Sequence, residues 1–155
     1  WLVEGTSNLL NEAGYDGLDC DWEFPENPED AQRLVDLVAL YRARLPKTLL
    51  TMAVTAGGYY GRWLNHRDLL PLFDFLNVMT YDFHGPWGDH AGHNAPLHEV
   101  REDPDGPANC CAGAMGYWTF VKGFPKEKLL LGLPCYGRSF PVSRWTSSVS
   151  TGTPT

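Results

Sequence analysis

The sequence predicts an α/β protein in which helices cover a parallel β-sheet. Strand-like and helix-like segments alternate along the 155 residues, which is the pattern of consecutive βα units. Acidic and aromatic side chains stand where the strand-like segments end. Four strands could form an open sheet, but (β/α)8 barrels build their sites at the C-terminal ends of their strands. The pattern therefore favours part of a (β/α)8 barrel.

The chain is predicted to begin with a helix and a strand. Residues 1 to 13 place apolar side chains such as Leu2 and Leu10 on a helical pattern, and Gly14 is a typical stop. Residues 16 to 25 open with an Asp-Gly turn and lie in an apolar run. Such a run is typical of a central parallel strand that is buried on both faces.

The second helix has a clear start and end. Asn27 is a suitable N-cap for a helix that begins at Pro28, and acidic residues occupy its first turn. Pro46 is expected to end it. One apolar stripe runs along this helix at helical spacing: Leu34, Leu37, Val38, Tyr41 and Leu45.

The remaining elements continue the alternation. In chain order we expect a strand over residues 49 to 56, a short helix over 66 to 70, a strand over 75 to 81, a long loop over 84 to 106, a helix over 108 to 122 and a strand over 129 to 136. The Ser/Thr-rich tail from Ser143 is expected to be irregular.

Three carboxylates stand at alternate positions of the first predicted strand. In the run Asp-Gly-Leu-Asp-Cys-Asp-Trp-Glu-Phe-Pro, which starts at residue 16, these are Asp19, Asp21 and Glu23. Alternate residues share one face of a strand and lie about 6.6 Å apart. A solvated face would tolerate them, but buried charges need shared protons and hydrogen bonds. The arrangement therefore favours a catalytic role over a structural one.

This run resembles the signature of glycoside hydrolase family 18, the chitinase family, in which the pattern is Asp-Gly-x-x-x-Asp-x-Glu. Asp16, Gly17, Asp21 and Glu23 match it, and Asp19 is a further acid that most active members carry. The resemblance implies a (β/α)8 barrel, of which this chain would hold roughly strands four to seven with their helices. Because a complete barrel needs about 250 residues, the chain is expected to be a partial catalytic domain, truncated at both ends.

Three later stretches resemble further strands of that family, in the expected order. Residues 52 to 57 read Met-Ala-Val-Thr-Ala-Gly, residues 77 to 85 read Asn-Val-Met-Thr-Tyr-Asp-Phe-His-Gly, and residues 131 to 140 read Leu-Gly-Leu-Pro-Cys-Tyr-Gly-Arg-Ser-Phe. One departure is Phe24, which stands where Tyr is frequent. The resemblance implies substrate-binding roles for five residues: Ala56, Met79, Asp82, Tyr136 and Arg138.

The family resemblance also implies a mechanism. Cleavage of a glycosidic bond needs an acid for the leaving oxygen, and Glu23 fits that role if burial and Asp21 raise its pKa. The nucleophile would be the N-acetyl carbonyl of the substrate, oriented by Asp21. Asp19 would share a proton with Asp21, and Tyr81 would donate to the acetamide carbonyl. The expected reaction is hydrolysis of β-1,4 bonds in chitin or N-acetylglucosamine oligomers, with retention at carbon one.

Two alternatives remain open from the residues. One is a non-catalytic chitin-binding lectin of the same family, although such proteins typically lose the position that Glu23 holds here. The other is an inactive fragment, because a segment without the rest of its barrel would have no closed site. Residues 1 to 155 alone are accordingly expected to be inactive.

The composition limits the classes of binding partner to be expected. The net charge of −7 argues against nucleic acid and anionic membrane surfaces, and no apolar run approaches the length of a membrane span. Six Trp, seven Tyr and seven Phe are many for this length, and sugar-binding clefts use exposed aromatic faces. The expected partner is an N-acetylglucosamine-containing oligosaccharide, bound by a secreted protein that is monomeric in its full-length form.

No metal site and no cofactor are expected. The four cysteines lack C-x-x-C spacing, and Cys20 and Cys135 are expected to be buried thiols within strands. The predicted loop over residues 84 to 106 is rich in histidine, but the spacing fits no helical zinc pair. We therefore expect these to be solvated loop histidines: His84, His90, His93 and His98.

Overall fold

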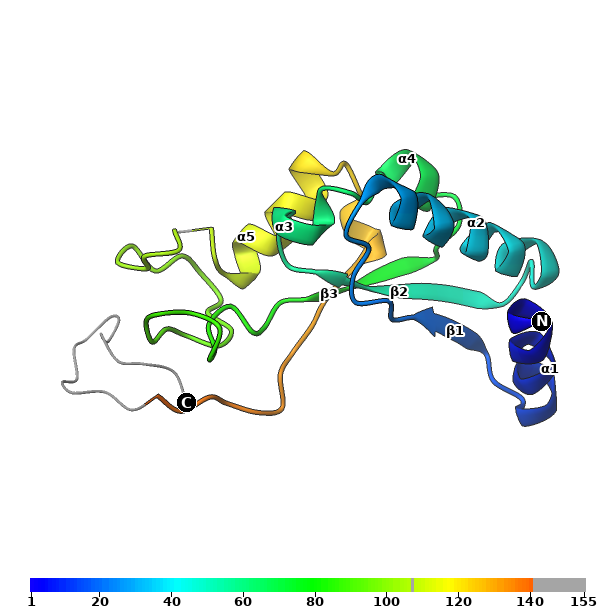
Figure 1. The fold of residues 1–155 in the computed structure, drawn as a ribbon, viewed down its shortest axis with the longest axis horizontal. Coiled ribbons are helices and arrows are strands. Elements are labelled where there is room, and N and C mark those ends of the chain that lie inside the picture. Colours follow the sequence, from blue (N-terminus) through cyan, green and yellow to red (C-terminus); the bar gives the residue numbers. More distant parts are fainter. Residues whose placement is uncertain (107, 141–155) are drawn as a thin grey trace.

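Four parallel strands form a single sheet that carries helices on one side (Figure 1). The computed structural model describes residues 1–106 and 108–140. The strands pair in chain order and all in parallel: β1 Gly17–Cys20, β2 Leu49–Thr55, β3 Phe75–Met79 and β4 Leu129–Leu131. This arrangement confirms the predicted α/β class and its parallel sheet.

The helical segments of the described residues are mostly short. They are α1 Leu2–Ala13, α2 Pro28–Arg44, α3 Gly58–Gly61, α4 His66–Leu69, α5 Cys111–Gly116, a π-helical segment Tyr117–Val121 and a 3-10 turn Lys126–Lys128. Helices α2 to α5 lie over the same face of the sheet, and the long loop after β3 extends beyond the C-terminal ends of the strands (Figure 1).

The two longest helices follow their predicted signals. Gly14 ends α1 with φ 72°, a left-handed conformation that glycine adopts without steric cost. Asn27 caps α2, because its Oδ1 accepts a hydrogen bond from the Asp30 amide at 2.8 Å. The predicted stripe of α2 is buried at Leu34, Val38, Tyr41 and Leu45, as expected for its core-facing side.

The core lies between the sheet and these helices. On β3, Leu76 and Val78 are fully buried, whereas Asn77 and its alternate neighbours are half-buried. Leu34 of α2 and Trp118 belong to the same hydrophobic core as Leu76 and Val78. The indole Nε1 of Trp118 also donates a hydrogen bond to the Thr55 carbonyl at 2.8 Å, which ties the helical segment after α5 to the end of β2.

The first strand differs from its prediction in length and burial. Among the described residues β1 pairs only with β2, so it is an edge strand and not a central one. Burial alternates along it as predicted, but Asp19, Asp21 and Glu23 are exposed. The expectation that these carboxylates are buried is wrong for this structure, because the described residues place no helix and no second strand over them.

The later elements also differ from their predicted bounds. β4 stops at Leu131, where its pairing with Val78 of β3 ends. As a result Tyr136 and Arg138 lie beyond the strand, and Cys135 is exposed, contrary to expectation. The predicted helix over residues 108 to 122 begins at Cys111, and the short helix α3 after β2 was not predicted. The tail from Ser143 lies outside the described residues.

No helix in the part of the chain that the structure describes is both long enough and apolar enough to cross a membrane.

Candidate active site

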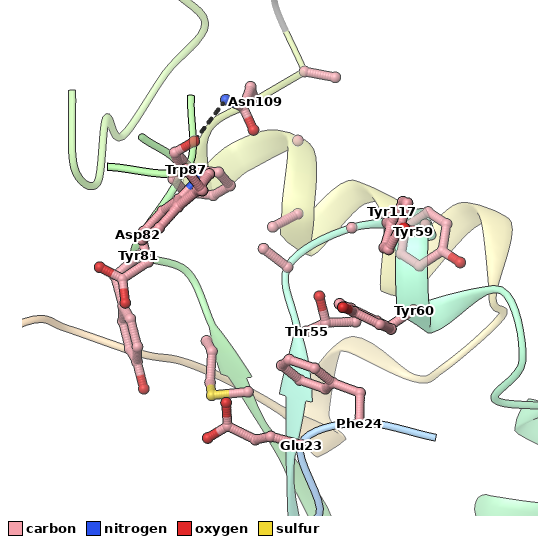
Figure 2. Close-up of a pocket in the computed structure, with 18 residues that line it drawn as sticks. Glu23, Phe24, Thr55, Tyr59, Tyr60, Tyr81, Asp82, Trp87, Asn109 and Tyr117 are labelled. Atoms are coloured by element: carbon pink, nitrogen blue, oxygen red, sulfur yellow. Dashed lines mark hydrogen bonds between the residues drawn. The ribbon is translucent and has the colours of Figure 1, made fainter. Parts of the chain in front are cut away.

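A cavity of about 870 Å³ opens beyond the C-terminal ends of β2 and β3. This volume lies within the range of about 300–1,000 Å³ that is usual for small-molecule sites. Figure 2 shows Tyr81, Asp82 and Trp87 on one side of it and Tyr59, Tyr60 and Tyr117 on the other. Five predicted site residues are among those that line it: Glu23, Ala56, Met79, Tyr81 and Asp82.

Glu23 is one of two acidic side chains among the described residues that line the cavity, the other being Asp82. It follows β1 by three residues and lines the cavity together with Met79, the last residue of β3 (Figure 2). Desolvation raises the pKa of Glu23 above its usual value, and the charge of Asp21, a hydrogen bond with Asp21 and the charge of Asp82 raise it further. A carboxyl group with a raised pKa keeps its proton closer to neutral pH, as a general acid requires.

Tyr81 lies close enough to these acids for their charges to act on its phenol group. Desolvation and then the charges of Glu23, Asp21 and Asp82 raise the pKa of its phenol. The hydroxyl group therefore stays protonated and can donate a hydrogen bond to an oxygen that gains negative charge. The structure thus brings Glu23, Asp21, Tyr81 and Asp82 into one interacting group.

Asp82 connects this group to the residues beyond β4. Its backbone has φ 59°, a left-handed conformation that is uncommon for residues other than glycine and clusters at functional sites. Arg138 donates to Asp82 Oδ1 through Nε at 2.9 Å and Nη2 at 2.6 Å. The Arg138 guanidinium group also lies over the rings of Trp87, at 4.8 Å, and Tyr136, at 5.6 Å. Tyr136 and Arg138 therefore join the site through Asp82, although neither lines the cavity.

Asp19 occupies a different environment from the other two acids. Its Oδ1 accepts hydrogen bonds from the Thr51 hydroxyl group and, at 2.9 Å, from Asn77 Nδ2. Those partners lie on β2 and β3, so Asp19 is held across three strands of the sheet. Asp21 hydrogen bonds to Glu23 instead. A proton shared between Asp19 and Asp21 stays a prediction.

Three tyrosines that line the cavity were not predicted as site residues: Tyr59, Tyr60 and Tyr117. Tyr59 and Tyr60 belong to the unpredicted helix α3, and Tyr60 stacks on Phe24 with ring centroids 4.7 Å apart. Tyr117 packs close to Gly61, where an added Cβ would lie 3.0 Å from its ring. Two adjacent tyrosines directly after Gly57-Gly58 were the available signal, because aromatic residues near turns are candidates for sugar contacts.

Comparison with known proteins identifies the family. The profile described as "Glycosyl hydrolases family 18" matches residues 2–150. The chain belongs to this family. A "Probable endochitinase" of Caenorhabditis elegans is 36% identical over 98% of the chain, which spans 26% of that protein. An "Oviduct-specific glycoprotein" of Sus scrofa is 36% identical over 90% of the chain, which spans 28% of that protein.

Solved structures of family 18 proteins share this fold. Catalytic domain 2 of the Ostrinia furnacalis group II chitinase has a TM-score of 0.84 and 33% identity over 99% of this chain and 42% of its own. The Trichuris suis chitinase TsES1 has a TM-score of 0.89 and 29% identity over 98% of this chain and 44% of its own. The four-stranded sheet is therefore part of a (β/α)8 barrel, and the chain spans less than half of these relatives.

Proposed function

We propose that this chain carries the catalytic acid of a family 18 glycoside hydrolase that cleaves β-1,4 bonds in chitin or N-acetylglucosamine oligomers. The observation that carries the proposal is the environment of Glu23. Its carboxyl group faces a cavity of about 870 Å³, and desolvation, Asp21 and Asp82 all raise its pKa. A group poised in this way suits protonation of a leaving oxygen.

The proposed reaction uses the substrate as its own nucleophile. Glu23 donates its proton to the glycosidic oxygen while the acetamide oxygen of the sugar that carries carbon one attacks that carbon, and the bond between carbon one and the leaving oxygen breaks. The product of this step is an oxazolinium ion. Water then attacks carbon one, gives its proton to Glu23 and restores the acetamide, so the configuration is retained. Family 18 enzymes are a known exception to the use of a carboxylate nucleophile.

The other site residues would assist this sequence. Asp21, hydrogen bonded to Glu23, would orient the acetamide and balance the charge of the oxazolinium ion. Tyr81 would donate a hydrogen bond to the acetamide carbonyl. Sugar contacts would come from Asp82, which Arg138 holds in place, and from Ala56, Met79 and Tyr136. The aromatic faces across the cavity would add stacking surface.

Relatives with bound ligands support the substrate class. One structure of the Ostrinia furnacalis group II chitinase domain is a complex with penta-N-acetylchitooctaose, and one of the group IV chitinase is a complex with allosamidin. By extension we propose that an N-acetylglucosamine oligomer is the partner of this protein. We also propose that the full-length protein is secreted and monomeric, and that residues 1–155 are a partial catalytic domain.

A non-catalytic sugar-binding protein is the second candidate. Oviduct-specific glycoproteins are among the relatives at 36% identity, and their name states no hydrolase activity. The presence of Glu23 with a raised pKa favours the enzyme.

The mechanism is tested by the requirement for an N-acetyl group on the sugar that supplies carbon one. We expect the full-length protein to bind partly acetylated chitosan but to cleave it only after acetylated units, because removal of the acetyl group removes the nucleophile. Sequencing of the new reducing ends gives the answer. Glucosamine at a large share of these ends would exclude the mechanism, and absence of cleavage on fully acetylated chains would favour the sugar-binding alternative.

A further inference from the structure

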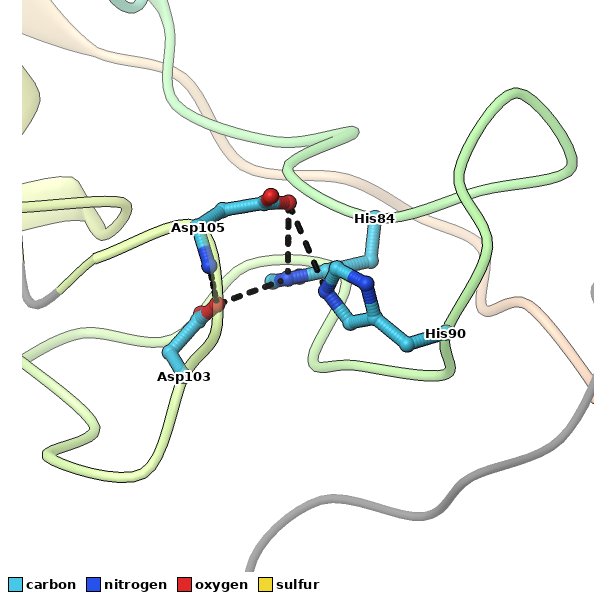
Figure 3. A group of neighbouring side chains, drawn as sticks. All are labelled: His84, His90, Asp103 and Asp105. Carbon is cyan, nitrogen blue, oxygen red and sulfur yellow. Dashed lines mark hydrogen bonds and ion pairs between the residues drawn. The ribbon is translucent and has the colours of Figure 1, made fainter.

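Two histidines and two aspartates converge in the loop that follows β3 (Figure 3). One ligand atom from each of His84, His90, Asp103 and Asp105 lies within 4.8 Å of the other three. His84 is 3% exposed and Asp103 is 8% exposed, so the expectation of solvated loop histidines is wrong for His84. Residues 84 and 105 are far apart in sequence, which is why their spacing gave no signal.

The hydrogen positions on the two imidazoles follow from their outer partners. His84 Nδ1 lies 2.9 Å from the His93 carbonyl oxygen, and a carbonyl oxygen only accepts hydrogen bonds. His90 Nδ1 lies 2.9 Å from Asp89 Oδ1 in the same manner. Both Nδ1 atoms therefore carry hydrogen. In the neutral rings the Nε2 atoms are left with a lone pair each.

These two lone pairs face carboxylate oxygens, which are also acceptors. His84 Nε2 lies 3.1 Å from Asp103 Oδ1 and 3.5 Å from Asp105 Oδ2, and His90 Nε2 lies 3.4 Å from the same Asp105 oxygen. His90 Nε2 is also shielded from solvent and makes no hydrogen bond with any described group. Four acceptor atoms that face one another repel unless a cation or protons lie between them.

We propose that His84, His90, Asp103 and Asp105 bind a divalent transition metal, with Zn²⁺ as the best match. Zinc bound to His nitrogen and carboxylate oxygen at about 2.0–2.2 Å in a tetrahedron separates its ligand atoms by about 3.3–3.6 Å. Three of the six separations between ligand atoms, 3.1, 3.4 and 3.5 Å, are close to that edge length, and all lie within 4.8 Å. Two carboxylates neutralise the ion, and two imidazoles select zinc over calcium or magnesium.

The surroundings of the cluster fix its ligands in advance. Hydrogen bonds from the outer ring nitrogens to a backbone carbonyl or a carboxylate are the usual support for metal-binding histidines. Asp103 Oδ1 also accepts a hydrogen bond from the Asp105 amide at 2.9 Å, which joins the two acids in one turn. Gly92 lies against the His84 ring, where an added Cβ would come within 2.3 Å of the ring atoms. A larger residue at that position would displace His84.

The metal would hold in place the loop beside the cavity of the proposed active site. His84 follows Asp82 by two residues, and Trp87, which lines the cavity and stacks on Arg138, lies between the two histidines in the sequence. The site would close the loop of residues 84 to 105 at both ends, so we assign it a structural role and no part in bond cleavage.

Zinc titration of the full-length protein, after removal of metals with a chelator, tests the proposal. The matched variants are His90→Gln within the cluster and His98→Gln on the exposed surface of the same loop. We expect the wild type and His98→Gln to bind one more equivalent of Zn²⁺ than His90→Gln, or to bind it at least about tenfold more tightly. Excess Ca²⁺ should not compete, and Co²⁺ should give the visible absorption of a tetrahedral complex in the same two proteins.

A second variant distinguishes loss of the metal site from misfolding of the loop. Substitution of buried His84 could unfold the loop, whereas the Asp105 side chain is 54% exposed, so Asp105→Asn should fold and still lose the site. Equal zinc binding by the wild type, His90→Gln and Asp105→Asn would overturn the proposal. So would nitrogen NMR signals that show both ring nitrogens of His84 and His90 protonated at saturating Zn²⁺, because the cluster would then be an imidazolium–carboxylate network only.

Discussion

At the scale of single residues, the proposed chemistry depends on the coupling of Glu23 to Asp21. Desolvation is the largest cause of the raised pKa of Glu23, and the Asp21 charge is the next. A raised pKa extends the protonated, active form of the acid to higher pH. We therefore expect the alkaline limb of the activity profile to lie at a higher pH than an ordinary glutamate would give.

Replacement of Asp21 by Asn tests that coupling. The substitution removes a negative charge, so the pKa of Glu23 should fall and the alkaline limb of kcat/KM should move to lower pH. The residual activity of the variant over a pH series is the measurement, with Asp36→Asn on the exposed side of α2 as the control. An alkaline limb that stays in place, or moves to higher pH, would contradict the assignment.

Much of the site could be predicted from the sequence, because its acids and Tyr81 follow strands with recognisable motifs. Glu23, Met79 and Tyr81, to which these motifs point, line the cavity, and their roles stay predictions. The histidine cluster could not be predicted, because it depends on how a loop without periodic pattern folds back on itself. Tyr59 was missed for a related reason: α3 has four residues, too few to show a helical period.

At the scale of secondary structure, capping and strand chemistry decide where the elements end. The start of α2 could be predicted because Asn27 and Pro28 carry local signals that do not depend on the rest of the fold. The ends of the strands were harder to predict from the sequence, because β3 and β4 stop where their neighbouring strands stop pairing. The change from α5 to a π-helical segment at Tyr117 also has no sequence signal that we can identify.

The cap of α2 gives a direct stability prediction. Asn27→Ala removes the hydrogen bond from the Asp30 amide and the one that Asn27 Nδ2 donates to Asp30 Oδ2. We expect a loss of about 1 kcal/mol in the free energy of unfolding, measured by urea denaturation of the full-length protein. Asn27→Ser, which keeps a capping oxygen, should lose clearly less. Equal losses in the two variants would show that the cap is not the source of the stability.

At the scale of the whole molecule, the described sheet has two unpaired edges. β1 and β4 each pair on one side only, and apolar side chains are exposed on and after β4, among them Leu130, Leu131 and Leu133. Unpaired edges beside apolar surface are sites of association between chains. In a complete (β/α)8 barrel further strands would cover these edges.

Residues 1–155 on their own should therefore associate and be inactive. Size-exclusion chromatography with light scattering at micromolar concentration should detect oligomers or aggregates, and hydrolysis of chitin oligomers should be undetectable. A monodisperse monomer that unfolds cooperatively would contradict the view that these edges need further strands.

The assignment of Glu23 as the catalytic acid is the central claim, and one pair of variants tests it most directly. Glu23→Gln keeps the shape of the side chain but cannot donate a proton, so chitin oligomers should still bind to the full-length protein while turnover falls by about 10²–10⁴-fold or more. Glu26→Gln, three residues further along and exposed, should leave both unchanged. Near-normal hydrolysis of chitin oligomers by Glu23→Gln would contradict the account.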